Sequence, residues 1–256
     1  MINGIKRAII SSTKNGEGLF PLARFTPKEL LPLGSSTVIQ KVVDEVIDCG
    51  VKDLIFISSN QKKEVVNHFT VFSDVPEEQE KFKEKYSDVD FCGVLQKKCS
   101  DAYAVYRAKE KIEEDAFIVI IPDSVFYGKK SSVEQIFSVY RTTQKPVVAL
   151  KEALNYEEGL CTVEVEKIAN RFYKIKSINE NPGKDDFPKL ALAGRYIFTQ
   201  SIFDYVGSNV SIAESLNKMI TAGKTIYGNH CEGDWFSLRD KKSYDSAQKF
   251  FLENNL

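Results

Sequence analysis

The sequence lacks the features that mark membrane-spanning, secreted and nucleic-acid-binding proteins. Lys and Arg number 35 against 36 Asp and Glu, so the basic excess typical of a polyanion binder is missing. The longest apolar run, residues 117–121, stops at Pro122, and the N-terminal apolar stretch is too short for a signal segment. We therefore expect a soluble, cytoplasmic protein without nucleic-acid or membrane partners.

The cysteines are too scattered for a zinc site or a disulfide framework. The five cysteines are Cys49, Cys92, Cys99, Cys161 and Cys231. Their number is odd and no CxxC pair exists, so we expect buried or half-buried free thiols. The two histidines, His68 and His230, are expected at the surface or in packing roles.

Apolar β-branched runs alternate with helical patterns through the first half of the chain. We expect strands at 5–11, 54–58, 90–95, 116–121 and 146–150. We expect helices at 35–48, capped by Ser35 or Ser36 and ended by Gly50, and at 61–69, 76–86, 101–112 and 132–142. This alternation predicts an α/β fold with a Rossmann-like, mixed but mostly parallel sheet and helices on both faces. Ligands of such folds bind at the edge where the strands end.

The second half has longer strands and fewer helices. Strands are expected at 161–165, 171–178 and 190–198, and helices at 211–222 and 241–253. We expect these strands to extend the sheet in a partly antiparallel way, within one domain over 1–256. The polar loop 179–188, which contains Pro182 and Gly183, is the expected flap.

Two stretches after the first strand could carry chemistry. The loop from Ser11 to Gly18 is polar and contains glycine, so its backbone N–H groups could face a phosphate. The hexapeptide 27–32, P-K-E-L-L-P, fixes the backbone around Lys28 with two prolines. A dinucleotide fingerprint is excluded, because Pro21 stands where G-x-G-x-x-G needs its last glycine.

These stretches resemble bacterial UTP–glucose-1-phosphate uridylyltransferases. That family has P-A-A-G-x-G-T-R-F-L-P followed by P-K-E-M-L-P, and here 11–21 and 27–32 follow with the same spacing. The resemblance continues through V-L-Q at 94–96, I-I-P-D at 120–123, L-A-L-A-G-R-Y-I-F at 190–198, and G-D-W-F at 233–236 with Tyr244.

The resemblance implies transfer of UMP from UTP to glucose 1-phosphate, with Mg²⁺ and a possible homo-oligomer. Lys28 would steady the triphosphate as the catalytic residue, and Asp123 would bind Mg²⁺. The nucleotide-binding half, 1–150, would use Ser12, Thr13, Gly16 and Gln96, the last reading uracil. The sugar-binding half, 151–256, would use Gly159, Gly194 and Glu180.

The chain departs from the family at charged positions. The family's arginine and threonine fall on Gly18 and Glu17, its first loop glycine on Lys14, and its second Mg²⁺ aspartate on Ser237. Further departures are S-D-A-Y-A for G-L-G-H-A at 100–104, Asn181 for a lysine, and Asn209 for an acid, although Glu214 keeps a later acid.

These losses predict reduced or lost activity, since each preorganised charge contact contributes on the order of 3 kcal/mol to the transition state. Substitute cations could offset them, and the candidates are Lys14, Arg24, Arg195 and Arg239. The alternative is a non-catalytic relative that binds a nucleotide, a sugar phosphate or a protein partner.

Overall fold

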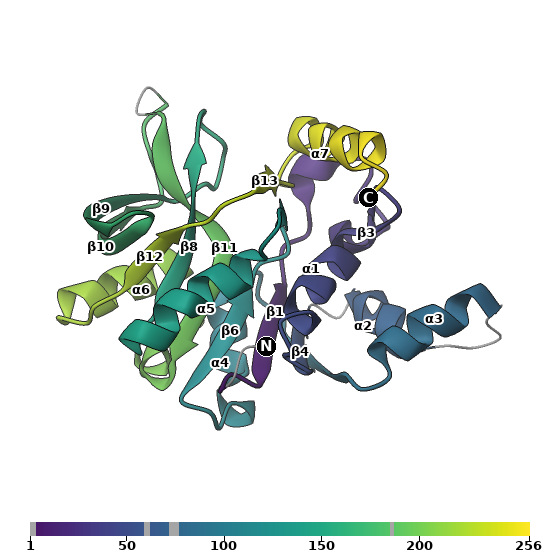
Figure 1. The fold of residues 1–256 in the computed structure, drawn as a ribbon, viewed down its shortest axis with the longest axis horizontal. Coiled ribbons are helices and arrows are strands. Elements are labelled where there is room, and N and C mark those ends of the chain that lie inside the picture. The colour runs from purple at the N-terminus through teal and green to yellow at the C-terminus, as the bar shows by residue number, and fades with distance from the viewer. Residues whose placement is uncertain (1–3, 59–61, 72–76, 185–186) are drawn as a thin grey trace.

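One nine-stranded sheet runs through the molecule and takes strands from both halves of the chain (Figure 1). The computed structural model describes residues 4–58, 62–71, 77–184 and 187–256. In spatial order the strands are β5 (Asp90–Leu95), β4 (Asp53–Ser58), β1 (Arg7–Ser12), β6 (Ala116–Ile120), β11 (Lys189–Thr199), β8 (Val147–Ala153), β12 (Tyr227–His230), β10 (Phe172–Asn179) and β9 (Thr162–Ala169).

The sheet is mixed, as expected, but less parallel than expected. Strands β5, β4, β1 and β6 are parallel, and β12 is parallel to β8. Strand β11 lies between β6 and β8 and is antiparallel to both, and β10 is antiparallel to β12 and β9. The first-half strands therefore all end on the same side of the molecule, and the loops that follow them meet there.

Both faces of the central strands β4, β1, β6 and β11 are buried, which explains the continuous apolar runs. Side chains alternate along each strand: in β6, Ile118 and Ile120 join one core cluster, while Phe117 and Val119 join the other. Helices α1 (Val38–Ile47) and α5 (Ser132–Thr143) pack in the first cluster, and α4 (Asp101–Arg107) and α6 (Ile212–Thr221) in the second. Figure 1 shows α5 crossing in front of the strands.

The largest differences from the expected helix ends are at the start of α1 and at the end of α4. Thr37, and neither Ser35 nor Ser36, caps α1, since its side chain accepts from Gln40 N; residues 36–37 instead form a short strand with 32–33. Helix α4 ends at Arg107 and a separate 3₁₀ turn, Lys109–Lys111, follows.

The remaining α-helices are α2 (Lys63–Thr70), α3 (Glu77–Tyr86) and α7 (Lys241–Glu253). Of these, α2 packs against the edge strand β5, and α7 packs against the short strands β13 (Asp234–Ser237) and β2 (Pro32–Leu33). Residues 61 and 76, where two helices were expected to begin, and positions 185–186 of the expected flap lie outside the described residues. Within the described part of the chain, no helix has both the length and the apolarity to cross a membrane. The expected cytoplasmic location stays a prediction.

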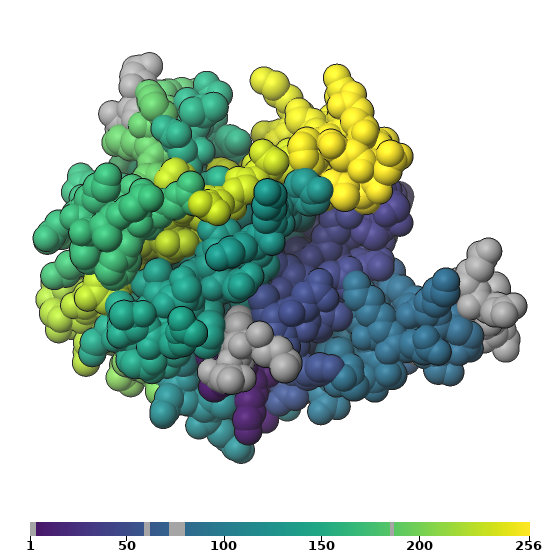
Figure 2. Space-filling view, in the orientation of Figure 1, coloured from purple at the N-terminus to yellow at the C-terminus, as the bar shows by residue number. Residues whose placement is uncertain are grey.

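Two short strands bring the last part of the chain to the strand ends. Strand β7 (Ser124–Tyr127) pairs antiparallel with β13 (Asp234–Ser237), and Leu238 N donates to Asp123 O at 2.8 Å. Figure 2 shows a notch at this edge, between the green atoms of the second half and the yellow atoms of α7.

Candidate functional site

A cleft at the strand ends consists of two adjoining cavities of about 430 and 470 Å³. The cavities share five lining residues, namely Lys14, Cys99, Asp123, Gly159 and Arg239. One cavity continues along the 14–18 loop and Lys28, and the other continues over Gly194 and Glu180. The cleft therefore joins the first loop of the chain to the second half of the sheet.

Asp123 is the buried centre of this cleft, with 3% of its surface exposed. Its Oδ2 lies 3.5 Å from Arg239 Nε and 3.9 Å from Lys14 Nζ. Burial by itself raises the pKa of this carboxyl, but Arg239, Lys28 and Lys14 outweigh that effect, and the net pKa is well below its usual range. Asp123 is therefore a carboxylate paired with Arg239 and Lys14, and the charge of Lys28 acts on it from farther away.

A second carboxylate, Asp101, anchors the first loop. Asp101 Oδ1 accepts from Ser11 Oγ at 2.6 Å and Thr13 Oγ1 at 3.3 Å, and Oδ2 lies 3.2 Å from Lys14 Nζ. Asp101 is also the first residue of α4, where a negative charge is favourable. The pKa of Lys14 is raised, chiefly by Asp101, so its ammonium stays charged.

A buried ion pair between Lys62 and Glu29 fixes the backbone of the first loop at Lys14. Lys62 Nζ donates to Glu29 Oε1 at 2.8 Å and to the carbonyl of Lys14 at 2.6 Å. Glu29 is fully buried and Lys62 is 4% exposed. The glutamate of P-K-E-L-L-P is thus a structural residue beneath the site, while the neighbouring Lys28 lines the cavity.

Six of the nine site residues expected from the sequence line the cleft. They are Gly16, Lys28, Asp123, Gly159, Glu180 and Gly194. Gly159 has φ +72° and open space where a Cβ would stand. Gly194 has φ +73°, and a Cβ there would meet Ile121 O at 3.1 Å, so both glycines are needed by the backbone.

The other three, Ser12, Thr13 and Gln96, are buried behind the cavity walls. Thr13 is bonded to Asp101. Gln96 Nε2 donates to Lys98 O at 2.7 Å and Ser100 O at 3.2 Å, so its amide N–H groups hold their own loop. Their roles in nucleotide binding stay predictions.

Gly18 and Ser237 are two of the positions where the chain lacks a charge that the family has, and they lie at the cleft and beside it. Gly18 lines one cavity, and a Cβ on it would lie 2.2 Å from Arg239 O. Ser237 is buried opposite Ser124 in the β13–β7 pair, and its Oγ has no partner among the described residues. The absence of a side chain at Gly18 therefore allows the backbone of Arg239 to pack against it.

Two of the four candidate substitute cations reach the cleft. Lys14 and Arg239 line both cavities. Arg195 instead is fully buried, bonded to Glu45 Oε2 at 2.9 Å and to Ser124 O at 3.1 Å, and braces the backbone after β6. Arg24 is exposed, with its guanidinium 4.8 Å from the centre of the Phe25 ring.

The residues present do not form a site that would hold Mg²⁺ by themselves. In the described residues, no group of three or more His, Cys, Asp or Glu side chains is placed for a metal. Asp123 offers one unpartnered oxygen, Oδ1, but Arg239 and Lys14 neutralise its charge. Mg²⁺ at Asp123 stays a prediction.

Cysteines are free, as expected, although Cys99 is exposed and not buried. Cys99 lines both cavities and Cys161 lines one. Burial raises the pKa of Cys161 and raises that of Cys231 to about 12, so these thiols stay protonated.

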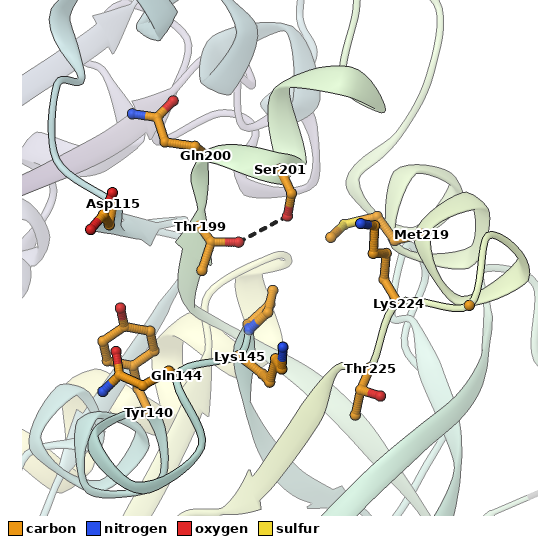
Figure 3. A pocket seen from close by; sticks show the side chains of 12 residues that line it. Asp115, Tyr140, Gln144, Lys145, Thr199, Gln200, Ser201, Met219, Lys224 and Thr225 are labelled. Atoms are coloured by element: carbon orange, nitrogen blue, oxygen red, sulfur yellow. Dashed lines mark hydrogen bonds between the residues drawn. The ribbon is translucent and has the colours of Figure 1, made fainter.

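A further cavity of about 540 Å³ lies at the other end of the strands, away from the cleft. Figure 3 shows Thr199 hydrogen-bonded to Ser201 there, with Lys145 and Lys224 nearby. Thr199 pairs with Ala116 at the start of β6, whereas Asp123 follows the end of that strand. None of the site residues expected from the sequence lines this cavity.

Comparison with known proteins identifies the class. The family model described as Nucleotidyl transferase matches residues 7–253, so the chain belongs to the nucleotidyl transferase family. The chain is 26% identical to UTP–glucose-1-phosphate uridylyltransferase 2 of Staphylococcus saprophyticus, over 94% of this chain and 89% of that protein. It is 24% identical to the UTP–glucose-1-phosphate uridylyltransferase of Mycoplasma pneumoniae, over 96% and 92%. The resemblance inferred from the sequence is confirmed.

Solved structures agree on the fold. A UDP-glucose pyrophosphorylase complexed with UDP-glucose matches with a TM-score of 0.87 at 24% identity, covering 98% of this chain and 99% of that one. A UTP-bound UGPase from Acinetobacter baumannii matches with a TM-score of 0.81 at 21% identity, covering 96% and 93%. The mixed α/β architecture is therefore that of the family.

Proposed function

We propose that this protein is a sugar-1-phosphate nucleotidyltransferase that binds UTP and glucose 1-phosphate and transfers UMP slowly. A phosphate oxygen of the sugar would attack the α-phosphorus of UTP, and the bond to pyrophosphate would break. The observation that carries the proposal is Asp123, buried among Arg239, Lys28 and Lys14 at the strand ends of a chain of this family. Such a reaction needs positioning and charge neutralisation more than a protein nucleophile.

In this proposal the two halves of the chain divide the substrates. Gly16 and Lys28, in 1–150, would face the triphosphate, and Gly159, Gly194 and Glu180, in 151–256, would face the sugar. The support is that these residues line adjoining cavities that share a wall. Any Mg²⁺ would arrive with the nucleotide as part of the substrate.

In this proposal, the charges that the family has and this chain lacks make the reaction slow, and positions 18 and 237 are two of them. Position 18 has no side chain, and position 237 has a hydroxyl in place of a carboxylate. Each lost contact to the transition state costs on the order of 3 kcal/mol, roughly a hundredfold in rate. Lys14 and Arg239 offset part of this loss, because both lie within 4 Å of Asp123.

The second candidate function is non-catalytic binding, and a specific observation favours it. The groups expected to hold the nucleotide are already used inside the protein: Gln96 holds its own loop, and Thr13 and Lys14 are bonded to Asp101. A nucleotide would have to compete with these contacts.

Pyrophosphate release from UTP, glucose 1-phosphate and Mg²⁺ tests the proposal. We expect slow, measurable turnover by the wild type and a large loss in Lys28→Ala, with Lys218→Ala in α6 as the control. Absence of turnover with other nucleotides and sugar phosphates as well, together with no thermal shift by UTP, would leave the non-catalytic function.

A further inference from the structure

The carboxylate at the centre of the cleft already has a cationic partner. Arg239 Nε and Lys14 Nζ both face Asp123 Oδ2, at 3.5 and 3.9 Å. Asp123 Oδ1 and Arg239 Nη1 are buried and have no hydrogen-bond partner among the described residues. Buried groups of this kind are normally satisfied, so the pair has capacity for a further polar ligand.

Position 239 is built into the fold and does not belong to a free surface loop. The backbone carbonyl of Arg239 packs against Gly18, where a Cβ would lie 2.2 Å away. The preceding residue, Leu238, bonds to the backbone of Asp123, and the following residue, Asp240, caps α7. The guanidinium is therefore presented to Asp123 from a fixed backbone.

A metal ion at Asp123 would have to lie beside this guanidinium. Like charges at such distances repel, and most strongly where burial lowers the dielectric constant. The neighbouring strand offers Ser237 in place of a second carboxylate. Asp123 is thus a poor metal ligand in this chain, because the guanidinium of Arg239 already neutralises its charge.

We propose that Arg239 occupies the place of a protein-bound metal ion, and that Arg239, Lys14 and Lys28 bind the phosphates of the ligand directly. Around Asp123 the cleft brings these three cations together with the carboxylates of Asp101 and Asp123, and the half-buried carboxylate of Glu180 lines the cavity on the other side. Glu17, Glu158, Glu214 and Asp240 also line the cavities, but they are exposed and screened by solvent. A guanidinium suits this role because its planar N–H groups match phosphate oxygens in pairs.

This inference deepens the proposed function and rests on it only for the identity of the nucleotide. The ligand class is a pyrophosphate-containing anion that binds without a metal ion bound to the protein. Inorganic pyrophosphate is therefore the probe, and its binding is measured by calorimetry in EDTA. Mn²⁺ alone, followed by electron paramagnetic resonance, is the second probe.

We expect the wild type to bind pyrophosphate in EDTA and to leave Mn²⁺ free. Arg239→Gln keeps a polar side chain and removes the charge, and should lower pyrophosphate affinity by about tenfold or more. Arg239→Lys should recover part of that loss. Arg141→Ala, an exposed arginine on α5 outside the cleft, is the matched control and should bind like the wild type. Thermal unfolding of each variant checks that it is folded.

Three results would overturn the inference: wild-type binding that needs a divalent metal, Mn²⁺ bound by the wild type and lost in Asp123→Asn, or unchanged affinity in Arg239→Gln. Failure of the proposed function is distinguishable. Binding of pyrophosphate without binding of UTP would reject the nucleotidyltransferase and support the phosphate site. Turnover with UTP, together with unchanged pyrophosphate affinity in Arg239→Gln, would support the nucleotidyltransferase and reject the role of Arg239.

Discussion

The ammonium of Lys62 bridges the carboxylate of Glu29 and the backbone carbonyl of Lys14, at 2.8 and 2.6 Å. Burial lowers the pKa of Lys62, and Glu29 opposes that effect. One buried ion pair thus fixes both the P-K-E-L-L-P segment and the loop that brings Lys14 to the cleft. The contribution of this ion pair to folding stability should be measurable separately from its effect on the position of Lys14.

Removal of one partner of this pair should be costly. Lys62→Met leaves the carboxylate of Glu29 buried without a counter-charge and should lower the free energy of unfolding by about 3 kcal/mol or more. The double variant Glu29→Gln with Lys62→Met should recover much of that loss, because no lone charge remains. Urea unfolding measures both. Lys241→Met, in an exposed pair with Asp245, is the control and should change stability by less than about 1 kcal/mol.

Gly18 should tolerate no side chain. Gly18→Ala forces Cβ against the carbonyl of Arg239, so we expect a loss of about 1–3 kcal/mol in unfolding free energy and weaker pyrophosphate binding. Gly207→Ala is the matched control, because a Cβ there meets nothing within 4 Å. Gly18→Arg with Ser237→Asp, which the family pattern favours for nucleotide affinity, should therefore fail to raise it. Tighter UTP binding in that double variant would contradict the packing described here.

Stability in acid should depend on Asp123. Its pKa is lower folded than unfolded, so it stabilises the protein above the unfolded value of about 3.9, and this contribution disappears as the pH falls through the folded value. Asp123→Asn should therefore flatten the fall in unfolding free energy below about pH 4. Urea titrations from neutral to acid pH measure the slope. An identical slope in wild type and variant would show that the three cations do not hold this carboxylate.

The cysteines should react in an order set by exposure. Cys99 is exposed and lines the cleft, while Cys49 and Cys231 are buried and burial raises the pKa of both thiols, that of Cys231 to about 12. A thiol reagent at neutral pH should modify Cys99 first and Cys49 and Cys231 only on unfolding. Mass spectrometry of tryptic peptides gives the order. Bound pyrophosphate should slow the reaction of Cys99, because both occupy the same cleft.

Local patterns predicted most elements, since their signals are contained in short windows. Strand β5 and helix α7 begin and end at the expected residues, because apolar runs and caps define them. The cap of α1 was wrong by one position: the backbone of 36–37 is used in a two-stranded pairing, which no helix signal reveals. The direction of β11 could not be predicted from alternation, because an apolar run reads the same in either direction.

Site residues that stand in motifs could be placed from the sequence, whereas Arg239 could only be named as one of four candidate cations, without its partner. Lys28 and Asp123 stand in motifs, and both line the cleft. Arg239 lies 116 residues from Asp123, and only the β13–β7 pairing brings the two together. Asp101 was noted only as a departure from the family, although its position at the start of a helix beside a serine- and threonine-rich loop was a usable signal.

Consecutive residues of strand β11 lie on opposite faces of the sheet. Leu192, Gly194 and Tyr196 line the cavity, whereas Ala193 and Ile197 pack into the opposite core and Arg195 bonds to Glu45. Under the proposed function, variants meant to alter sugar preference should change 192 and 196 and leave the odd-numbered neighbours untouched. A library that randomises the whole segment would lose most of its members to unfolding before ligand preference could be selected.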